Sequence, residues 1–396
     1  MTDLSHPAPQ FSAIDAERLA KEVFGVSASA SELDSERDCN FRLKTGTESD
    51  WILKIVNASE PKVESEFQTA LLHHLSNAKS KLAVPHLKPS LAGDVLASTV
   101  AGGGEKHALR LVGWLPGTPL AQVTRTFDLM RNLGRSLGEL DHALQGFIHP
   151  GALRDLDWDL RYAGRARTRL HFIDDADKRA LLDRFITRFE TLVEPKLAGL
   201  RAQVIHNDAN DWNVLVDNTD HEKIAGLIDF GDAVHTVLIA EVAIACAYSA
   251  LDTVDPIGAA AALASGFHEK YPLKAEEIDL LFDLIAMRLV TSVTISASRR
   301  EKTDDNPYLA ISEAPAWRLL EKMDAMNSRF ATAILRKACG FDAIDGAGAI
   351  RQWISDNAKT FAPIVRPAPA TMTKAIVPYG DASHFMTVAS AEQRAT

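Results

Sequence analysis

Residues 204–216, VIHNDANDWNVLV, together with residues 226–232, GLIDFGD, carry the strongest signal in this chain. Each segment combines a short apolar run, of the kind that forms a buried strand, with a loop rich in polar residues. Asp208 and Asn213 lie in the first loop, and Asp229 follows sixteen residues after Asn213. Either motif alone is more often a simple turn. The two in this order predict a phosphoryl-transfer site on two strand-edged loops.

Each of these side chains suits one task in the transfer of a γ-phosphate to an alcohol. That reaction needs charge neutralisation and an acceptor held in line more than it needs covalent help. Mg²⁺ prefers oxygen ligands and keeps several waters, so Asn213 and Asp229 are predicted to hold it beside the phosphates. Asp208 is predicted to accept the hydrogen bond of the attacking hydroxyl, which requires no raised pKa. His206 is expected to pack within its loop.

At these residues the chain resembles the aminoglycoside phosphotransferase and choline kinase superfamily, small-molecule relatives of protein kinases. The phrases HNDANDWNVLV, IDFGDAVHT, WLPGTPLA, RDLDWDLRYA and ACGF are similar to those of its hydroxylysine kinase-like members. The resemblance runs from about residue 14 to about residue 363. It implies an α+β, bilobal protein-kinase-like fold, with an antiparallel N-lobe sheet carrying helices and a mainly helical C-lobe. It also implies phosphate transfer from ATP or GTP to an amino alcohol or a hydroxy amino acid.

Length and composition limit the classes of protein that fit this chain. Its 396 residues suffice for one large core or two lobes, and 46% hydrophobic with 24% charged residues is typical of a soluble globular protein. The net charge of −10 argues against nonspecific binding to nucleic acid or to an anionic membrane. The three cysteines lack metal spacing, the N-terminal residues do not resemble a secretory signal, and no apolar run is long enough to span a bilayer. We therefore expect a cytoplasmic protein.

Residues 1–112 are predicted to form the N-lobe. Lys54 lies in the middle of an alternating strand, residues 51–56, where a lysine is costly unless it faces a polar partner or solvent. A helix over residues 61–75 follows it. The resemblance favours Glu66 of this helix as the partner that directs Lys54 at the α- and β-phosphates. The alternative is a surface lysine on an edge strand.

The hairpin over residues 26–43 corresponds in kinases to the loop that covers the phosphates. It contains no glycine, although such loops usually carry several. Ser35, Arg37 and backbone N–H groups are the candidates for that role. A solvated polar turn is an equally good interpretation of these residues.

Residues 113–120, GWLPGTPL, are predicted to connect the lobes, because helical periodicity dominates from residue 124 onward. The resemblance implies that backbone groups of this connection bind the nucleotide base. Trp114 is a candidate for stacking near the base, and packing is an equal alternative. The C-lobe is predicted to extend over residues 113–360, with helices at residues 127–144, 152–162, 178–192, 237–251, 257–271, 276–298 and 316–338.

The segment after Asp232 separates this chain from protein kinases. Those enzymes need a long activation segment with an Ala-Pro-Glu anchor, and an Arg where this chain has Asn207. A small-molecule kinase is therefore predicted. Asp232 is a candidate for binding a substrate ammonium group, and Arg299 or Arg300 for binding a substrate carboxylate. A helix cap and a solvated loop are the commoner roles of such residues.

Residues 361–396 contain four prolines and no helix or strand pattern, which is typical of a linker. In similar proteins the kinase unit is sometimes fused to further catalytic domains. We therefore expect this segment to be the remnant of such a linker, or the edge of a truncated chain that leads to a fused downstream domain.

Two classes of function fit these observations. The first is a kinase that uses Mg²⁺ with ATP or GTP and acts on a small amino-bearing alcohol, with 5-hydroxylysine favoured. Choline or ethanolamine, homoserine, methylthioribose and aminoglycoside kinases are the alternatives within this class. The second is a pseudokinase, a nucleotide-binding module of a multidomain protein. Lys54, Asp208, Asn213 and Asp229 are all intact, which favours the enzyme.

Overall fold

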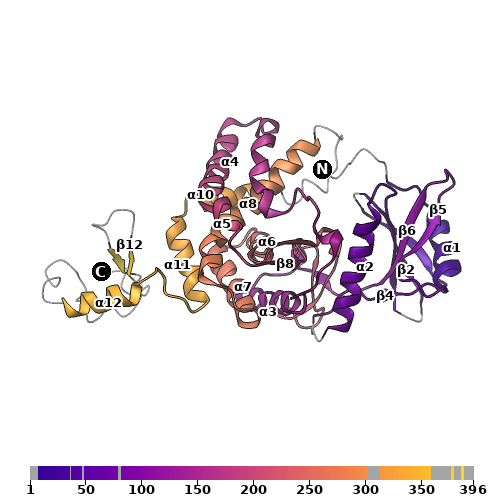
Figure 1. Ribbon diagram of the computed structural model, residues 1–396, viewed down its shortest axis with the longest axis horizontal. Helices are drawn as coiled ribbons and strands as arrows, with labels where there is room; N and C mark the ends of the chain where they lie inside the picture. Colours follow the sequence, from indigo (N-terminus) through magenta and orange to yellow (C-terminus); the bar gives the residue numbers. More distant parts are fainter. Residues whose placement is uncertain are drawn as a thin grey trace.

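The computed structural model describes residues 8–35, 37–46, 49–78, 82–300, 313–357, 376–378 and 385–387. Within these ranges the chain forms a sheet-based N-lobe at one end and a mainly helical C-lobe beside it (Figure 1). This arrangement confirms the predicted α+β, bilobal fold.

An antiparallel sheet with strand order β1-β2-β3-β6-β4 forms the N-lobe, and β5 also pairs with β6. The helix α1 (Ala13–Phe24) packs against it. This helix begins with a reciprocal cap between Ser12 and Asp15 and ends at Gly25, whose φ of 68° suits glycine. The strands are β1 (Ser29–Leu33), β2 (Cys39–Lys44), β3 (Trp51–Ile55), β4 (Leu87–Lys88), β5 (Ala97–Val100) and β6 (Lys106–Gly113).

Alternation along β3 turns successive side chains to opposite faces of the sheet. Leu53 and Ile55 are fully buried in the cluster that includes α1. Lys54 therefore points to the other face, on the same side as Ile52, which packs against the core of the C-lobe. The strand pattern alone thus turns the lysine toward the lobe interface.

The helix α2 (Lys62–Asn77) lies between the sheet and the C-lobe (Figure 1). Phe67, Leu71 and Leu75 form one helical stripe at a spacing of four residues. All three are buried in the same hydrophobic cluster as the C-lobe helices. The helix belongs to the N-lobe by sequence and to the C-lobe core by packing.

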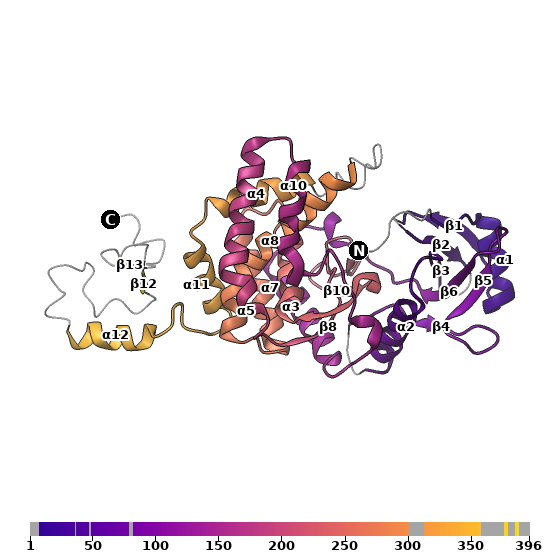
Figure 2. The ribbon, with the colours of Figure 1, turned by 45° about the horizontal axis from the view of Figure 1, so that its top comes forward.

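The C-lobe is built mostly from helices, and α3 and α7 lie side by side in it (Figures 1 and 2). Two glycines permit this close contact, because a Cβ atom at Gly134 or Gly266 would overlap a carbonyl oxygen of the facing helix. The α-helices are α3 (Phe127–Ala143), α4 (Ala176–Arg188), α5 (Glu194–Leu197), α6 (Ile239–Ser249), α7 (Pro256–Lys270), α8 (Ala275–Arg300), α10 (Glu313–Asp324), α11 (Ser328–Ala338) and α12 (Ala347–Asp356). The other helical segments are η1 (Leu120–Gln122), η2 (Pro150–Ala152), η3 (Leu160–Phe172), η4 (Phe189–Val193) and η5 (Phe230–Asp232).

Two small antiparallel sheets carry the polar loops of the C-lobe. One has the order β10-β9-β7, and the other pairs β11 with β8. The connection between the lobes contributes β7, so it is hydrogen-bonded to the strand that follows Asn213. The strands are β7 (Thr118–Pro119), β8 (Ala202–Ile205), β9 (Val214–Val216), β10 (Ile224–Leu227) and β11 (Val234–Val237).

Two predicted helices differ from the structure. The helix expected at residues 152–162 is wrong, because the chain there is a loop followed by η3, which Asp159 caps. The helix expected at residues 316–338 is two helices, because Asn327 begins α11 by accepting the N–H of Phe330. All three cysteines are free and buried.

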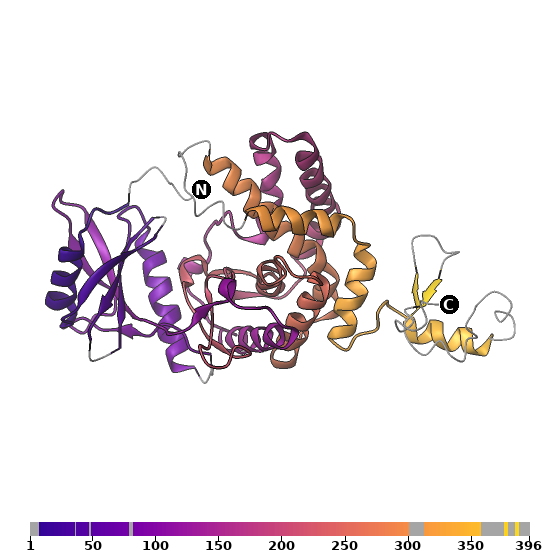
Figure 3. The same cartoon turned by 180° about the vertical axis from the view of Figure 1, so that it is seen from behind.

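Most of the predicted linker, residues 361–396, lies outside the described residues. The exceptions are β12 (Ile376–Pro378) and β13 (Phe385–Thr387), which pair antiparallel and which the sequence pattern did not predict. Figure 3 shows α12 beyond α11, at the end of the molecule opposite the N-lobe sheet. Within the described ranges, no helix has the combination of length and apolarity needed to cross a membrane.

Candidate active site

The two polar loops lie side by side beneath the N-lobe because short strands fix both of them. The strand β8 leads into the loop of Asp208, and β11, which pairs with β8, follows the loop of Asp229. The N–H of Ile228 donates to the carbonyl oxygen of Asn213 at 3.0 Å and joins the loops directly. Asn207 adopts a left-handed φ of 64°, and its N–H donates to Oε2 of Glu241 at 3.0 Å.

The carboxylate of Asp208 is held by three donors. Its Oδ2 accepts from the side-chain amides of Asn210 at 3.0 Å and Asn213 at 2.8 Å. Its Oδ1 accepts from the guanidinium of Arg288 at 2.7 Å. The side chain is 20% exposed, so Asp208 is fixed in orientation and still accessible.

The pKa of Asp208 differs from the ordinary value that the sequence led us to expect. Burial raises its pKa to about 8, while Arg288 opposes that rise and the nearby carboxylates of Asp232 and Asp229 add to it. A cation bound at Asp229 would act against the rise, because it offsets the negative charge of the neighbouring carboxylates. The sequence motif contains these charges but not their mutual distances.

Asn213 and Asp229 each present one oxygen that suits a metal ion. The Nδ2 of Asn213 donates to Oδ2 and to the carbonyl oxygen of Asp208, which fixes the amide and leaves its Oδ1 as the ligand atom. Asp229 has a left-handed φ of 59°, and its Oδ1 accepts the N–H of Gly231. Among the described residues no cluster of three His, Cys, Asp or Glu side chains is placed to bind a metal. Mg²⁺ fits here as an ion that takes its remaining ligands from phosphate and water.

Lys54 reaches across the lobe interface to this loop. Its Nζ lies 3.2 Å from Oδ1 of Asp229, and the lysine side chain is 21% exposed. The positive charge of Lys54 is the main reason that the pKa of Asp229 falls to about 2. The structure thus places the predicted phosphate-binding lysine beside the predicted metal-binding aspartate.

The predicted pair of Lys54 with Glu66 is not formed in this structure. Glu66 pairs instead with Lys62, one helical turn away on the exposed side of α2, at 2.8 Å. Glu64 pairs at 2.9 Å with Arg154, whose side chain is only 6% exposed. The correction is therefore that α2 directs Glu64 rather than Glu66 toward the site.

Arg154 links α2 to the loop that follows Asp229. Its guanidinium donates to the carbonyl oxygens of Gly231 and Ala233, and it also bonds to Glu64. A single buried arginine thus connects a helix at the lobe interface with the backbone next to Asp229. Arg154 was not among the predicted site residues, although it is the first residue of the phrase RDLDWDLRYA that carries part of the family resemblance.

The residues predicted to cover the phosphates and flank the base lie between β1 and β2 and at the start of the connection between the lobes. Arg37 is half-buried and its charge acts on Asp232, whereas Ser35 is exposed. The ring of Trp114 lies 3.8 Å below the guanidinium of Arg42. The backbone N–H of Trp114 donates to the carbonyl oxygen of Asp50 at 3.0 Å, so the start of the connection is tied to the sheet.

The three candidate substrate residues fall into two places. Asp232 lies among Asp208, Asp229, Arg154 and Arg288, and burial raises its pKa while Arg154 opposes the rise. Arg299 and Arg300 are the last residues of α8, and Arg300 pairs with Glu313. Twelve residues of helix separate Arg288 from Arg300, about 18 Å along the axis. The structure does not bring Arg299 and Arg300 to Asp208.

His206 packs inside its loop as the sequence analysis predicted. It is fully buried, its Nε2 lies 3.0 Å from the carbonyl oxygen of Ile228, and its ring meets that of Phe230 edge-on at 4.5 Å. Burial lowers its pKa to about 4. A neutral imidazole of this kind supports the loop and carries no charge into the site.

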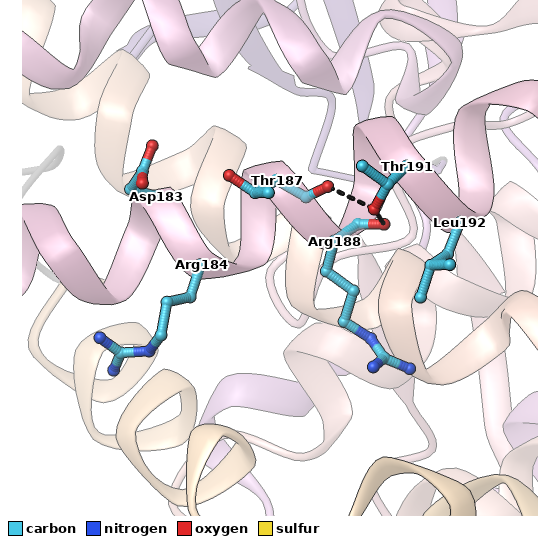
Figure 4. A pocket seen from close by; sticks show the side chains of 6 residues that line it. All are labelled: Asp183, Arg184, Thr187, Arg188, Thr191 and Leu192. Carbon is cyan, nitrogen blue, oxygen red and sulfur yellow. Dashed lines mark hydrogen bonds between the residues drawn. The ribbon is translucent and has the colours of Figure 1, made fainter.

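A separate hollow on α4 and η4 is lined by Asp183, Arg184, Thr187, Arg188, Thr191 and Leu192 (Figure 4). Its two arginines are neutralised by Asp324 and Asp283, each at 2.5 Å. The hollow contains none of the predicted site residues.

A model of the phosphotransferase enzyme family matches residues 29–277, which is more than half of the chain. The chain belongs to this family. The phosphotransferase is 29% identical over 350 residues to a hydroxylysine kinase of Xenopus laevis, covering 82% of this chain and 92% of that protein. It is 27% identical over 343 residues to a hydroxylysine kinase of Mus musculus, covering 81% and 91% of the two chains.

Solved structures share the fold of this phosphotransferase. A microcompartment-associated aminopropanol kinase has a TM-score of 0.62 at 19% identity, covering 84% of this chain and 100% of its own. An amicoumacin kinase in complex with AMP-PNP and Ca²⁺ has a TM-score of 0.61 at 13% identity, covering 80% and 95%. The fold is therefore protein-kinase-like, and the phosphotransferase is a small-molecule kinase.

Proposed function

We propose that the enzyme transfers the γ-phosphate of ATP or GTP to the hydroxyl of a small amino-bearing alcohol, with 5-hydroxylysine as the favoured acceptor. The observation that carries this proposal is that Lys54 of the N-lobe lies together with Asp208, Asn213 and Asp229 of the C-lobe, joined by hydrogen bonds. The similarity to two vertebrate hydroxylysine kinases along most of the chain supports the choice of acceptor.

In this proposal each residue acts on a defined atom. The acceptor hydroxyl donates its hydrogen bond to Asp208, its oxygen attacks the γ-phosphorus, and the bond from that phosphorus to the β–γ bridging oxygen breaks. The proton passes to Asp208 late in the transfer, and a nucleoside diphosphate leaves. Lys54 binds phosphate oxygens once the nucleotide enters. Mg²⁺ held by Asn213 and Asp229 would neutralise charge on the phosphates.

The acceptor's amino group has a natural partner in this cleft. The carboxylate of Asp232 lies near those of Asp208 and Asp229. A substrate ammonium bound to Asp232 would compensate the negative charge of this group. Ser35, Arg37 and Trp114 remain our candidates for covering the phosphates and flanking the base. In this proposal, backbone groups of residues 113–120 bind the nucleotide base and select between ATP and GTP.

The test is a phosphate-transfer panel. The purified enzyme with Mg²⁺ is offered ATP or GTP together with 5-hydroxylysine, 1-amino-2-propanol, ethanolamine, choline, homoserine or kanamycin. We expect turnover with 5-hydroxylysine that is lost in Asp208→Asn. Turnover with another alcohol of the panel, but not with 5-hydroxylysine, would change the proposed acceptor and leave the proposed reaction as it is. Nucleotide binding without transfer to any acceptor would contradict the proposal.

A further inference from the structure

Arg288 is a buried cation in the middle of the apolar run LIAMRLV of α8, residues 284–290. It is 1% exposed. Its guanidinium lies 4.6 Å from the ring centre of Trp158 and 5.3 Å from that of Tyr248. Burying a charge at such a position is costly unless the surroundings satisfy it. The partners of Arg288 therefore indicate what the side chain does.

Three acceptors of the C-lobe bind this guanidinium. Nε donates to the hydroxyl of Tyr248 at 3.3 Å, and Nη1 donates to the carbonyl oxygen of Trp158 at 3.3 Å. Nη2 donates to Oδ1 of Asp208 at 2.7 Å, the shortest of the three. The planar fork of an arginine reaches acceptors in three directions, which the compact ammonium of a lysine cannot reproduce in one position.

These contacts determine which atom of Asp208 is available to an acceptor hydroxyl. A carboxylate offers about four lone-pair positions. The amides of Asn210 and Asn213 occupy both positions of Oδ2, and Arg288 occupies one position of Oδ1. One position of Oδ1 is left. Without Arg288 the carboxylate would be held only by the two amides on Oδ2, and Oδ1 would lose the donor that fixes its position.

We propose that Arg288 is a positioning residue for phosphate transfer, holding Asp208 so that Oδ1 receives the hydrogen bond of the acceptor hydroxyl. This inference rests on the function proposed above. Arg288 acts through Asp208 and does not itself bind the nucleotide. A change at Arg288 should consequently reduce the rate of the chemical step while leaving both substrates' binding largely intact.

Arg288→Lys is the primary variant, and Arg336→Lys is its matched control. Arg336 is also a buried arginine of a C-lobe helix, 6% exposed, with acceptors on Asp279, Asp342 and Asp345, but it lies outside the site. With the acceptor that the wild type phosphorylates, we expect kcat of Arg288→Lys to fall about 100-fold, as for a misplaced reacting group. Nucleotide Kd and acceptor KM should change less than about threefold, whereas Arg336→Lys should keep kcat and lower Tm.

A double variant tests the route of the effect. If Arg288 acts through Asp208, Arg288→Lys should cause little further loss in single-turnover transfer when Asp208 is already Asn. A second full loss in that background would overturn the proposal, as would wild-type kcat in Arg288→Lys. An effect confined to acceptor KM would make Arg288 a substrate-binding residue instead and also overturn it.

Tyr248→Phe provides a milder perturbation if Arg288→Lys does not fold. It removes only the hydroxyl that receives the Nε of Arg288 and keeps the ring. We expect a smaller loss of kcat, about tenfold, with unchanged acceptor KM. Unchanged kcat in Tyr248→Phe together with an unfolded Arg288→Lys would count against the proposal. A wild type that phosphorylates no alcohol would overturn the proposed function as well, whereas an active wild type separates the two conclusions.

Discussion

Nζ of Lys54, from the central part of the N-lobe sheet, lies 3.2 Å from Oδ1 of Asp229 in the C-lobe. This ion pair joins two residues that are far apart in sequence and that belong to different lobes. In the function proposed above, a bound nucleotide would exchange the carboxylate partner of Lys54 for phosphate oxygens.

Replacing Lys54 by Met should lower kcat/KM for the nucleotide about 100-fold or more, because one preorganised positive charge is lost from the transferring phosphates. The measurement is steady-state transfer at varied nucleotide concentration. Lys62→Met is the control, since Lys62 is 85% exposed and pairs only with the surface carboxylate of Glu66. If the two variants have equal kinetics, Lys54 does not bind the phosphates of the nucleotide.

Replacing Arg154 by Met should destabilise the enzyme and reduce its activity together. The change leaves Glu64 without its cation and frees the carbonyl oxygens of Gly231 and Ala233. Breaking a buried pair in this way costs about 3 kcal/mol in the free energy of unfolding. Chemical denaturation and the KM for Mg²⁺ report the two effects, and the KM should rise because the loop of Asp229 loosens.

The control for Arg154 is Arg165→Met. Arg165 is 38% exposed and pairs with Asp155 at the surface. Its loss should cost less than about 1 kcal/mol. If Arg154→Met is as stable as this control, the link from α2 to the loop contributes nothing to the fold.

Replacing Glu241 by Gln should make the stability of the protein less dependent on pH. Burial raises the pKa of Glu241 from 4.5 to about 7, and burial together with Glu241 raises that of the buried Asp141. The folded protein then binds a proton more tightly than the unfolded chain, so this contribution is full below pH 4.5 and is lost as pH rises through 7. Denaturation between pH 5 and pH 8 should show a falling free energy of unfolding in the wild type and a flatter dependence in Glu241→Gln.

Glu22→Gln on the surface of α1 is the control for removing one carboxylate, and it should keep the wild-type slope. Asp141→Asn should flatten the slope as Glu241→Gln does, because the two buried carboxyls disfavour each other's ionisation. The same slope in all four proteins would place the pH dependence elsewhere.

Replacing Gly134 by Ala should destabilise the C-lobe, because the new methyl group would overlap the carbonyl oxygen of Leu263 in the facing helix. Forcing a methyl into so close a contact costs about 1 to 3 kcal/mol. Gly102→Ala adds the same group in a turn with nothing within 4 Å and should be nearly neutral. Thermal denaturation of both variants compares them, and a neutral Gly134→Ala would mean that α3 and α7 separate easily.

The sequence predicted the fold and the closeness of Lys54, Asp208, Asn213 and Asp229 because short-range patterns encode them. The alternation of residues 51–55 turns Lys54 away from α1, and the strands on either side of Asp208 and Asp229 place both loops at one edge. These features depend on neighbours in sequence. The family match and the fold confirm the class of enzyme that they implied.

Residues whose role depends on how helices are rotated or extended were not predictable in this way. Glu64 and Glu66 are two positions apart on α2, so they point to different sides, and the burial of Phe67 and Leu71 decides which one faces the cleft. Arg288 is marked in the sequence as a lone charge in an apolar helical run, but Arg299 and Arg300 were the arginines predicted to bind substrate. Those two lie in a conspicuously polar segment, but the continuous helix α8 carries them away from the site.

The packing of α2 has a consequence for control of the enzyme. Phe67, Leu71 and Leu75 share one core with the C-lobe helices, and Arg154 ties Glu64 to the loop beside Asp229. Swinging this helix outward would expose those apolar side chains to water and break a buried ion pair, at a cost of several kcal/mol. A conformational change that displaced α2 would have to offset that cost, so we expect this helix to stay with the C-lobe when the lobes move.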